Sequence, residues 1–295
     1  MDKLLMLDSG HSFNTAGKKS PDNSFFEWGF NNRMQYKIKK RAEEHGIHVF
    51  LSNPNPDRVS DIPLSTRATK MNDYWKAKGR PTAMMISLHA NAYSDKNNDK
   101  DGFNSARGTE TFVASNASKT SKDFAKSLND EVVKTMRSLD SGAKDRGVKV
   151  YDWTVIYKTN TPCVLAEYGF YTNRGDLKIL KNNQDELVEA TIKALCKYFG
   201  VTYKPVKNEE IKEEEKKGMY ENVIIYKGEV DGNIAEIVHW GLTDSIVVSV
   251  EDYKAGLGKK TIGVGGVCNE LATDVKIIST NRFETIKVAL NYIGK

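Results

Sequence analysis

Short apolar runs alternate with longer amphipathic stretches through about the first 200 residues, and this alternation restricts the fold more than any other feature of the chain. The apolar runs are expected to form strands, and they cover residues 3–7, 48–51, 83–88, 109–114 and 164–166. Strands that alternate with helices are typical of a parallel sheet, because a parallel crossover needs a long connection. The pattern therefore predicts an α/β fold with a mostly parallel, twisted sheet flanked by helices on both faces.

Three stretches between these runs carry apolar side chains at the spacing of one helix face. The first covers about residues 25–45, and Gly46 follows it as a stop signal. The second runs from about 118 to 139, and the third from about 176 to 199, where Gly200 closes it. These helices would supply the layers that cover the sheet.

A charged segment ends the alternation at residues 203–218, where the sequence reads YKPVKNEEIKEEEKKG. It holds too few apolar side chains to bury a core, which is typical of an extended linker. We therefore expect a larger domain over residues 1–202, a linker over 203–218 and a smaller domain over 219–295.

The smaller domain repeats the alternation on a shorter scale. Strands are expected over residues 222–226, 245–250 and 275–279, a short helix over 232–240, and a turn beside another strand at Gly263–Gly266. A last helix begins at Asn281, because Asn281 and Glu284 have the spacing of a capping box. This pattern predicts a small α/β domain.

Charge is distributed unevenly between the two domains. Residues 1–218 carry 36 Lys and Arg against 29 Asp and Glu, whereas residues 219–295 carry 8 against 10. A basic first domain favours a polyanionic partner, but no nucleic-acid recognition motif is present, so no nucleic acid is expected. No apolar run approaches the roughly 18 residues that span a bilayer, and the N-terminal run is too short for a signal peptide. We therefore expect a chain made in the cytoplasm, without a membrane partner and with reduced cysteines.

Histidine and glutamate side chains follow three of the predicted strands. His11 comes after the first within LDSGHS, His89 after the third within SLHAN, and Glu167 after the fifth within AEYGF. The carboxyl ends of parallel strands meet at one sheet edge, where α/β folds place their sites. Glu27 joins them at the start of the first helix. LDSGHS alone also fits a simple turn, but the four residues together define a candidate site.

Two imidazoles and one carboxylate are typical ligands of a catalytic zinc ion, which keeps one position open for water. Zinc lowers the pKa of that water to about 7, and a further carboxylate is needed to carry its proton to the leaving amine. We therefore expect one Zn²⁺ in the larger domain, held by His11, Glu27 and His89, with Glu167 as the catalytic base. The other histidines are expected to be structural: His45, His48 and His239.

Three motifs resemble the signatures of the zinc-dependent N-acetylmuramoyl-L-alanine amidases of type 3. They are DSGH at 8–11, SLHANA at 87–92 and LAEYGFYTN at 165–173, in the order and at the distances of that family. The resemblance covers about residues 1–200 and implies zinc at His11, Glu27 and His89, with Glu167 catalytic. Two departures stand out: Ser12 follows the first histidine where the family often has glycine, and the 94–107 stretch is long and polar, as in a lid or a disordered loop.

The last 75 or so residues resemble the cell-wall-binding module of clostridial bacteriophage endolysins, through YKGEVDG, GVGG and NRFET. This resemblance implies a peptidoglycan hydrolase released to the wall after a holin permeabilises the membrane. Its partners would be peptidoglycan and associated anionic wall polymers. The alternative role of the second domain is dimerisation, either as a homo-oligomer of full chains or with a C-terminal fragment that starts near Met219. Such a fragment is expected because the codons upstream of Met219 must be purine-rich and resemble a ribosome-binding site.

The expected reaction is hydrolysis of the amide between N-acetylmuramic acid and L-alanine. The alternatives are a zinc carboxypeptidase or endopeptidase acting on the stem peptide, and a binding protein with a degenerate site. Substrate or supporting contacts are expected from three further residues: Asn91, Asn173 and Arg67.

Overall fold

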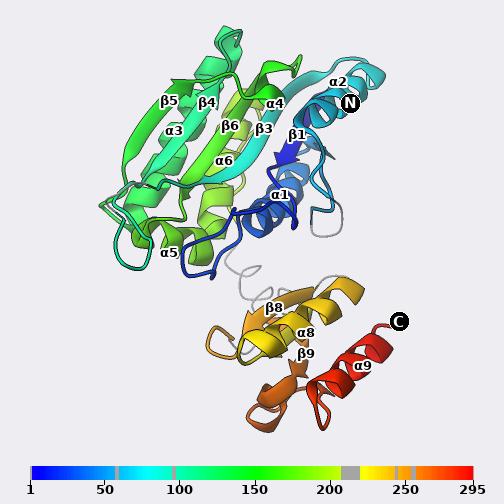
Figure 1. The fold of residues 1–295 in the computed structure, drawn as a ribbon. Coiled ribbons are helices and arrows are strands. Elements are labelled where there is room, and N and C mark those ends of the chain that lie inside the picture. The colour runs from blue at the N-terminus through cyan, green and yellow to red at the C-terminus, as the bar shows by residue number, and fades with distance from the viewer. Residues whose placement is uncertain are drawn as a thin grey trace. The chain divides into compact units, whose positions relative to one another are not determined.

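The computed structural model describes residues 2–56, 60–94, 98–206, 220–242, 245–253 and 257–294. The chain divides into two compact units, Met1–Lys204 and Pro205–Lys295 (Figure 1). Each unit has its own hydrophobic core and its own sheet.

The first unit is built on a six-stranded sheet with the order β2–β1–β3–β6–β4–β5. Neighbouring strands are parallel except for β4 and β6, which are antiparallel. The predicted mostly parallel α/β fold is therefore confirmed. The elements of this unit are β1 (Lys3–Ser9), α1 (Glu27–Glu44), β2 (His48–Leu51), α2 (Leu64–Ala77), β3 (Thr82–Asn91), β4 (Thr109–Val113), α3 (Lys119–Leu139), β5 (Asp145–Val150), α4 (Thr154–Tyr157), β6 (Cys163–Phe170), α5 (Arg174–Asn182) and α6 (Gln184–Phe199).

Helices cover both faces of this sheet (Figure 1). Strand β1 shows why, since Leu5 and Leu7 point into one core while Leu4 and Met6 point into the other. Helices α1, α3 and α6 pack on the first face, and α2 and α4 on the second. A strand that is apolar on both faces is stable only under two helical layers.

The predicted helix over 176–199 is wrong in one respect, because the structure has two helices there. Asn183 ends α5 and precedes α6 with φ −129° and ψ 37°, outside the helical region. Its side chain donates to Glu186 Oε1 at 3.0 Å, and asparagine commonly replaces helical backbone bonds in this way.

Helix α2 and strand β5 were not predicted. Helix α2 buries few apolar side chains, chiefly Ala68 and Met71, and β5 has no buried residue. Neither segment therefore shows the apolar periodicity on which the prediction relied.

The second unit holds a four-stranded parallel sheet with the order β10–β9–β7–β8. Helices α8 and α9 pack over one face around Ile224, Ala235 and Ala289. The predicted small α/β architecture is present, although β9 extends through Val264, beyond the start of the predicted turn. The elements are β7 (Tyr220–Tyr226), α8 (Glu229–Gly241), β8 (Ser245–Ser249), β9 (Gly258–Val264), the 3-10 helix η1 (Gly265–Asn269), β10 (Val275–Ile277) and α9 (Arg282–Tyr292).

The start of the predicted linker belongs to the first unit. The backbone N–H of Lys204 donates to His45 Nε2 at 2.9 Å, and the Tyr203 ring stacks on the His45 ring. These contacts also give His45 the structural role expected for it. Residues 207–218 of the predicted linker lie outside the described residues.

Among the described residues, no helix is long and apolar enough to cross a membrane.

Candidate functional site

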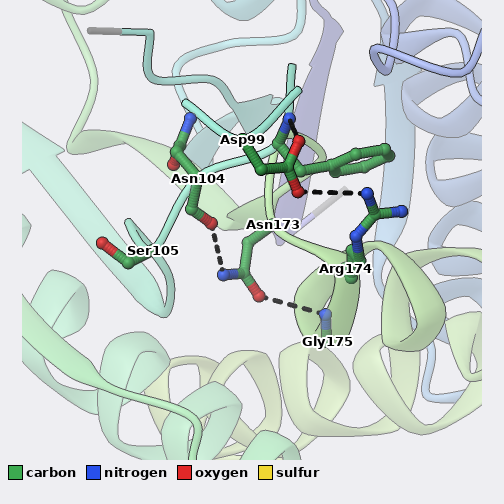
Figure 2. Close-up of a pocket in the computed structure, with 7 residues that line it drawn as sticks. Asp99, Asn104, Ser105, Asn173, Arg174 and Gly175 are labelled. Carbon is green, nitrogen blue, oxygen red and sulfur yellow. Dashed lines mark hydrogen bonds and ion pairs between the residues drawn. The ribbon is translucent and has the colours of Figure 1, made fainter. Parts of the chain in front are cut away.

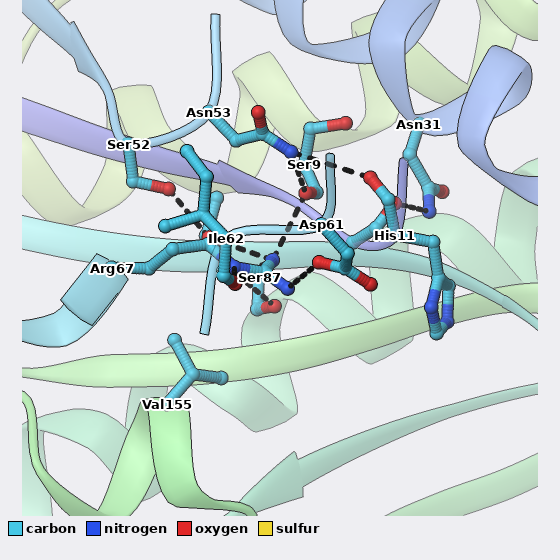
Figure 3. A network of polar contacts seen from close by, with 12 residues as sticks. Ser9, His11, Asn31, Ser52, Asn53, Asp61, Ile62, Arg67, Ser87 and Val155 are labelled. Atoms are coloured by element: carbon cyan, nitrogen blue, oxygen red, sulfur yellow. Dashed lines mark hydrogen bonds and ion pairs between the residues drawn. The ribbon is translucent and has the colours of Figure 1, made fainter. Parts of the chain in front are cut away.

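His11 is placed by the turn that follows β1. The N–H of Gly10 donates to the Leu88 carbonyl of β3 at 3.1 Å, which keeps the chain beside β3 for one more residue. His11 has a φ of +64°, in the left-handed region that few non-glycine residues adopt. Asn31 Nδ2 donates to the Gly10 carbonyl at 2.9 Å, and Asn53 Nδ2 to the His11 carbonyl at 3.3 Å (Figure 3). The turn is thus held from two sides.

His89 lies on β3 directly against Gly10. A Cβ atom at position 10 would lie 2.2 Å from His89 Cε1 and 2.5 Å from its Nε2, far inside van der Waals contact. The rings of His11 and His89 meet edge to face, with their centroids 5.1 Å apart. The glycine of the DSGH motif therefore makes room for the second histidine.

Glu27 closes the group from the first residue of α1. Its Oε1 lies 2.9 Å from His89 Nδ1 and 3.4 Å from His11 Nε2. The N–H of Ala90 also donates to this oxygen, at 3.3 Å. Side-chain exposure is 3% for Glu27 but 17% for His11, so the group is buried on the protein side and open on the other.

The three side chains fit a zinc ion in donor type and spacing. One nitrogen of each histidine and one Glu27 oxygen lie within 4.8 Å of one another. Tetrahedral zinc with bonds of about 2.0–2.2 Å separates its donors by about 3.3–3.6 Å. The distance of 3.4 Å from the Glu27 oxygen to His11 Nε2 lies in that range, whereas the distance of 2.9 Å to His89 Nδ1 is shorter and is that of a hydrogen bond.

The electrostatics of these groups agree with a ligand role. Burial alone would raise the pKa of Glu27, but hydrogen bonds and charge from His11 and His89 outweigh it and hold the pKa at about 2. Burial lowers the pKa of His89 despite the adjacent carboxylate. An ionised carboxylate and a neutral imidazole are the forms that bind metals.

Glu167 lies at the same sheet edge, on β6. It is the register partner of His89 on β3, so the two side chains leave the sheet on the same face. Its Oε2 is buried and has no hydrogen-bond partner among the described residues. Burial raises the pKa of Glu167 well above its ordinary value, and the negative charges of Glu27 and Glu110 raise it further. A carboxyl group in such a position is suited to accept and return a proton.

The sequence profile of N-acetylmuramoyl-L-alanine amidases (Amidase_3) matches residues 5–197, a range that includes all of these residues. The chain belongs to this amidase family.

Curated relatives match two thirds or more of the chain. The endolysin of Bacillus phage SPP1 is 26% identical over 239 residues, which cover 79% of this chain and 79% of that protein. The uncharacterized protein YqiI of Bacillus subtilis is 27% identical over 202 residues, 67% of this chain and 85% of its own length.

Two solved structures share the fold over about two thirds of this chain. The N-acetylmuramoyl-L-alanine amidase from Clostridium difficile 630 has a TM-score of 0.56 at 25% identity, covering 68% of this chain and 97% of that one. The catalytic domain of CwlV from Bacillus (Paenibacillus) polymyxa var. colistinus has a TM-score of 0.55 at 21% identity, covering 68% and 99%.

Arg67 lies beneath the end of β1, where it makes a supporting contact, one of the two kinds of contact predicted for it. Its side chain is only 2% exposed, because it pairs with the fully buried Asp8 at 3.2 Å and donates to the Ser9 carbonyl at 3.1 Å (Figure 3). Asp8 also accepts from the hydroxyls of Ser52 and Ser87. Arg67 therefore supports the end of β1 at Asp8, which is three residues before His11.

Asn173 caps helix α5 and ties it to the loop before β4. Its Oδ1 accepts from Gly175 N at 3.0 Å, and its Nδ2 donates to the Asn104 carbonyl at 2.9 Å (Figure 2). Residues 98–107 of the polar 94–107 stretch, for which a lid or a disordered loop was expected, are folded against α5 here, with Arg174 over the ring of Phe103. Whether Asn173 also contacts substrate stays a prediction.

Asn91 is two residues beyond His89 on β3. Its Nδ2 donates to Glu110 Oε1 at 2.7 Å, so it links the end of β3 to β4. Its contact with substrate also stays a prediction.

Gly10 and Glu110 lie at the site but were not predicted as site residues. Glu110 had a signal, because a glutamate between β-forming residues in TETFV is as costly to bury as Glu167 in VLAEYGF. Gly10 had none beyond the resemblance, since its closeness to His89 depends on how β1 and β3 pair.

Proposed function

We propose that this amidase-family chain is a peptidoglycan hydrolase of the endolysin type, which cleaves the amide between N-acetylmuramic acid and L-alanine. The observation that carries the proposal is the convergence of His11, Glu27 and His89 within 4.8 Å. The buried carboxyl of Glu167 lies on the neighbouring strand, in register with His89. The match over 79% of the SPP1 endolysin supports the endolysin class.

His11, Glu27 and His89 would hold one zinc ion through one donor atom each. When bound, zinc supplies Lewis-acid chemistry, polarising the scissile carbonyl and making water more acidic. The support beneath these residues, from Asn31, Asn53 and the Asp8–Arg67 pair, would keep them in position before substrate arrives.

Glu167 would carry the proton. Its unpartnered Oε2 accepts a proton from the water that attacks the carbonyl carbon. As the carbon–nitrogen bond breaks, the same carboxyl returns this proton to the alanine nitrogen, so the products are the lactyl carboxylic acid and a free amine. The raised pKa of Glu167 makes its carboxylate a stronger base and so favours acceptance of the proton from water.

For the second unit we propose binding to the cell wall, as in clostridial phage endolysins. The enzyme would be made in the cytoplasm and would reach anionic wall polymers after a holin opens the membrane. Dimerisation through this unit, or with a fragment starting near Met219, would be compatible with wall binding.

The test is zinc content together with released-amine analysis on purified peptidoglycan. We expect new N-terminal alanine from the zinc-loaded wild type. Glu167→Gln should keep zinc and lose at least about 100-fold in rate, the usual contribution of a general acid–base group, whereas His89→Ala should lose both zinc and activity. Glu43→Gln is the matched control, since this exposed carboxylate lies near the other end of α1 from Glu27.

The possible results separate the proposed reaction from its alternatives. A different new amine would support the stem-peptide peptidase. Unchanged hydrolysis by Glu167→Gln would refute the role of Glu167.

A further inference from the structure

Three titratable residues lie side by side across neighbouring strands at the candidate site. His89 of β3 is the register partner of Glu167 on β6, and Glu167 is the register partner of Glu110 on β4. Directly paired residues leave a sheet on the same face, with Cβ atoms about 4.5–5.5 Å apart in an antiparallel pair. Glu110 therefore stands beside Glu167, on the side away from the proposed zinc ligands.

Two cations of β5 reach Glu110. Arg146 Nε donates to Glu110 Oε2 at 2.7 Å, and Lys149 Nζ contacts the same oxygen. The other oxygen of Glu110 accepts from Asn91, so this carboxylate is fixed on both sides. Asp145, next to Arg146, is directed elsewhere, since it accepts from Asn129 and Gly147.

This cluster has a surplus positive charge that faces solvent. The Glu110 side chain is 5% exposed, whereas Arg146 is 34% and Lys149 is 40% exposed. Among the described residues, Glu110 is the only carboxylate within ion-pair distance of either cation. The Arg146 guanidinium lies 4.8 Å from the centre of the Phe170 ring, which places it over β6, three residues from Glu167. One buried carboxylate thus orients two exposed cations beside Glu167.

The order of groups along the sheet edge gives the direction of a bound substrate. The metal-ligand group comes first, then Glu167, then Arg146 and Lys149. Glu167 protonates the leaving nitrogen in the proposed reaction, so a leaving peptide that continues along this edge, away from the metal-ligand group, would extend from Glu167 toward the two cations. Two strand spacings are about 9–10 Å, and two extended residues span about 7 Å. A carboxylate on the residue after alanine reaches this distance when its own side chain or carboxyl group adds the remaining length of about 2–3 Å.

We propose that Arg146 and Lys149 bind a carboxylate of the stem peptide, on the residue that follows the alanine. The enzyme therefore prefers peptidoglycan in which this carboxyl group is free over peptidoglycan in which it is amidated. Charge-assisted contacts of arginine and lysine with carboxylates are the strong class of hydrogen bond. This inference rests on the proposed function.

The experiment compares two purified peptidoglycans that differ in whether the acidic residue after alanine carries a free or an amidated carboxyl. Release of N-terminal alanine by the zinc-loaded full chain is measured over a range of substrate concentrations. We expect the wild type to favour the free carboxyl by about 10-fold or more at low substrate, as expected for a hydrogen bond to a charged group. Arg146→Gln and Lys149→Gln should each reduce this preference, mainly through KM, while the rate on the amidated wall stays within about threefold.

Lys144→Gln is the matched control, because it removes an exposed lysine just before β5 and should leave the preference unchanged. Equal loss on both walls in Arg146→Gln would mean a purely structural role and would overturn the inference. Equal rates of the wild type on both walls would also overturn it. No new N-terminal alanine from either wall would instead refute the proposed function.

Discussion

Gly10 determines whether the ring of His89 keeps its place beside Glu27. A Cβ atom at position 10 would lie 2.2, 2.5 and 2.7 Å from three atoms of that ring, and ordinary contacts of this kind begin near 3.4 Å. In Gly10→Ala the ring must therefore retreat by about 1 Å or rotate, because overpacking is relieved by such shifts. Either movement breaks the 2.9 Å contact between His89 Nδ1 and Glu27.

The expected cost of Gly10→Ala falls mainly on function. Metal ligands tolerate deviations of about 0.2 Å, and a misplacement of about 1 Å commonly costs 100-fold in rate. We expect zinc content to fall and hydrolysis of peptidoglycan to drop at least about 100-fold. Stability should fall by about 1–3 kcal/mol, the usual range for overpacking. Metal analysis, turbidity loss of purified walls and thermal unfolding measure the three quantities.

Gly79→Ala is the control for this prediction. Gly79 has a φ of +79° and open space around a Cβ atom, so alanine there strains the backbone without touching the site. We expect it to cost about 1 kcal/mol of stability and no activity. If Gly10→Ala binds zinc and hydrolyses walls as the wild type does, the proposed packing of Gly10 against His89 is wrong.

Three further predictions concern buried groups and the half-buried Glu236. Asp8→Asn should destabilise the first unit by about 3 kcal/mol, at the low end for breaking a buried pair because Arg67 keeps its contact with Asp61; chemical denaturation measures this. All three thiols are buried, and burial raises the pKa of Cys163 to about 12, so a thiol reagent at pH 8 should label none in the native chain and three after unfolding. Burial raises the pKa of Glu236 above its ordinary value of 4.5, so the folded state favours its protonated form and stability falls as pH rises from 4.5 through the raised pKa. Glu236→Gln should remove that slope and stabilise the second unit at pH 7, as followed by thermal unfolding at several pH values.

The sequence predicted best those helices and strands whose own apolar residues show which face is buried. The apolar strands and the helices α1 and α3 could be predicted, because the spacing of their apolar residues marks the face that is buried. His11, His89 and Glu167 could be grouped because parallel strands bring their carboxyl ends to one edge. The structure shows that β3 and β6 continue through His89 and Glu167, so these residues lie within the strands.

The contacts of Glu110 and Asp8 could not be predicted, because they depend on how strands and helices distant in the sequence pack together. The neighbours of Glu110 follow from the reversed direction of β4 and the register of β5. The pairing of Asp8 with Arg67 depends on where α2 packs, and α2 itself has too few apolar side chains to be predicted. The local sequence shows which polar residues lie within apolar segments, whereas the packing of distant segments determines which residues they contact.

The reversal of β4 has a consequence for how such an enzyme can diversify. Because β3 ends and β4 begins at the same sheet edge, the connection between them, residues 92–108, starts and finishes beside the site. Changes in the length or composition of this connection leave every strand register intact, and the strands alone carry His89, Glu110 and Glu167. Selection can therefore reshape the approach of the wall to this edge while the reacting groups stay where they are.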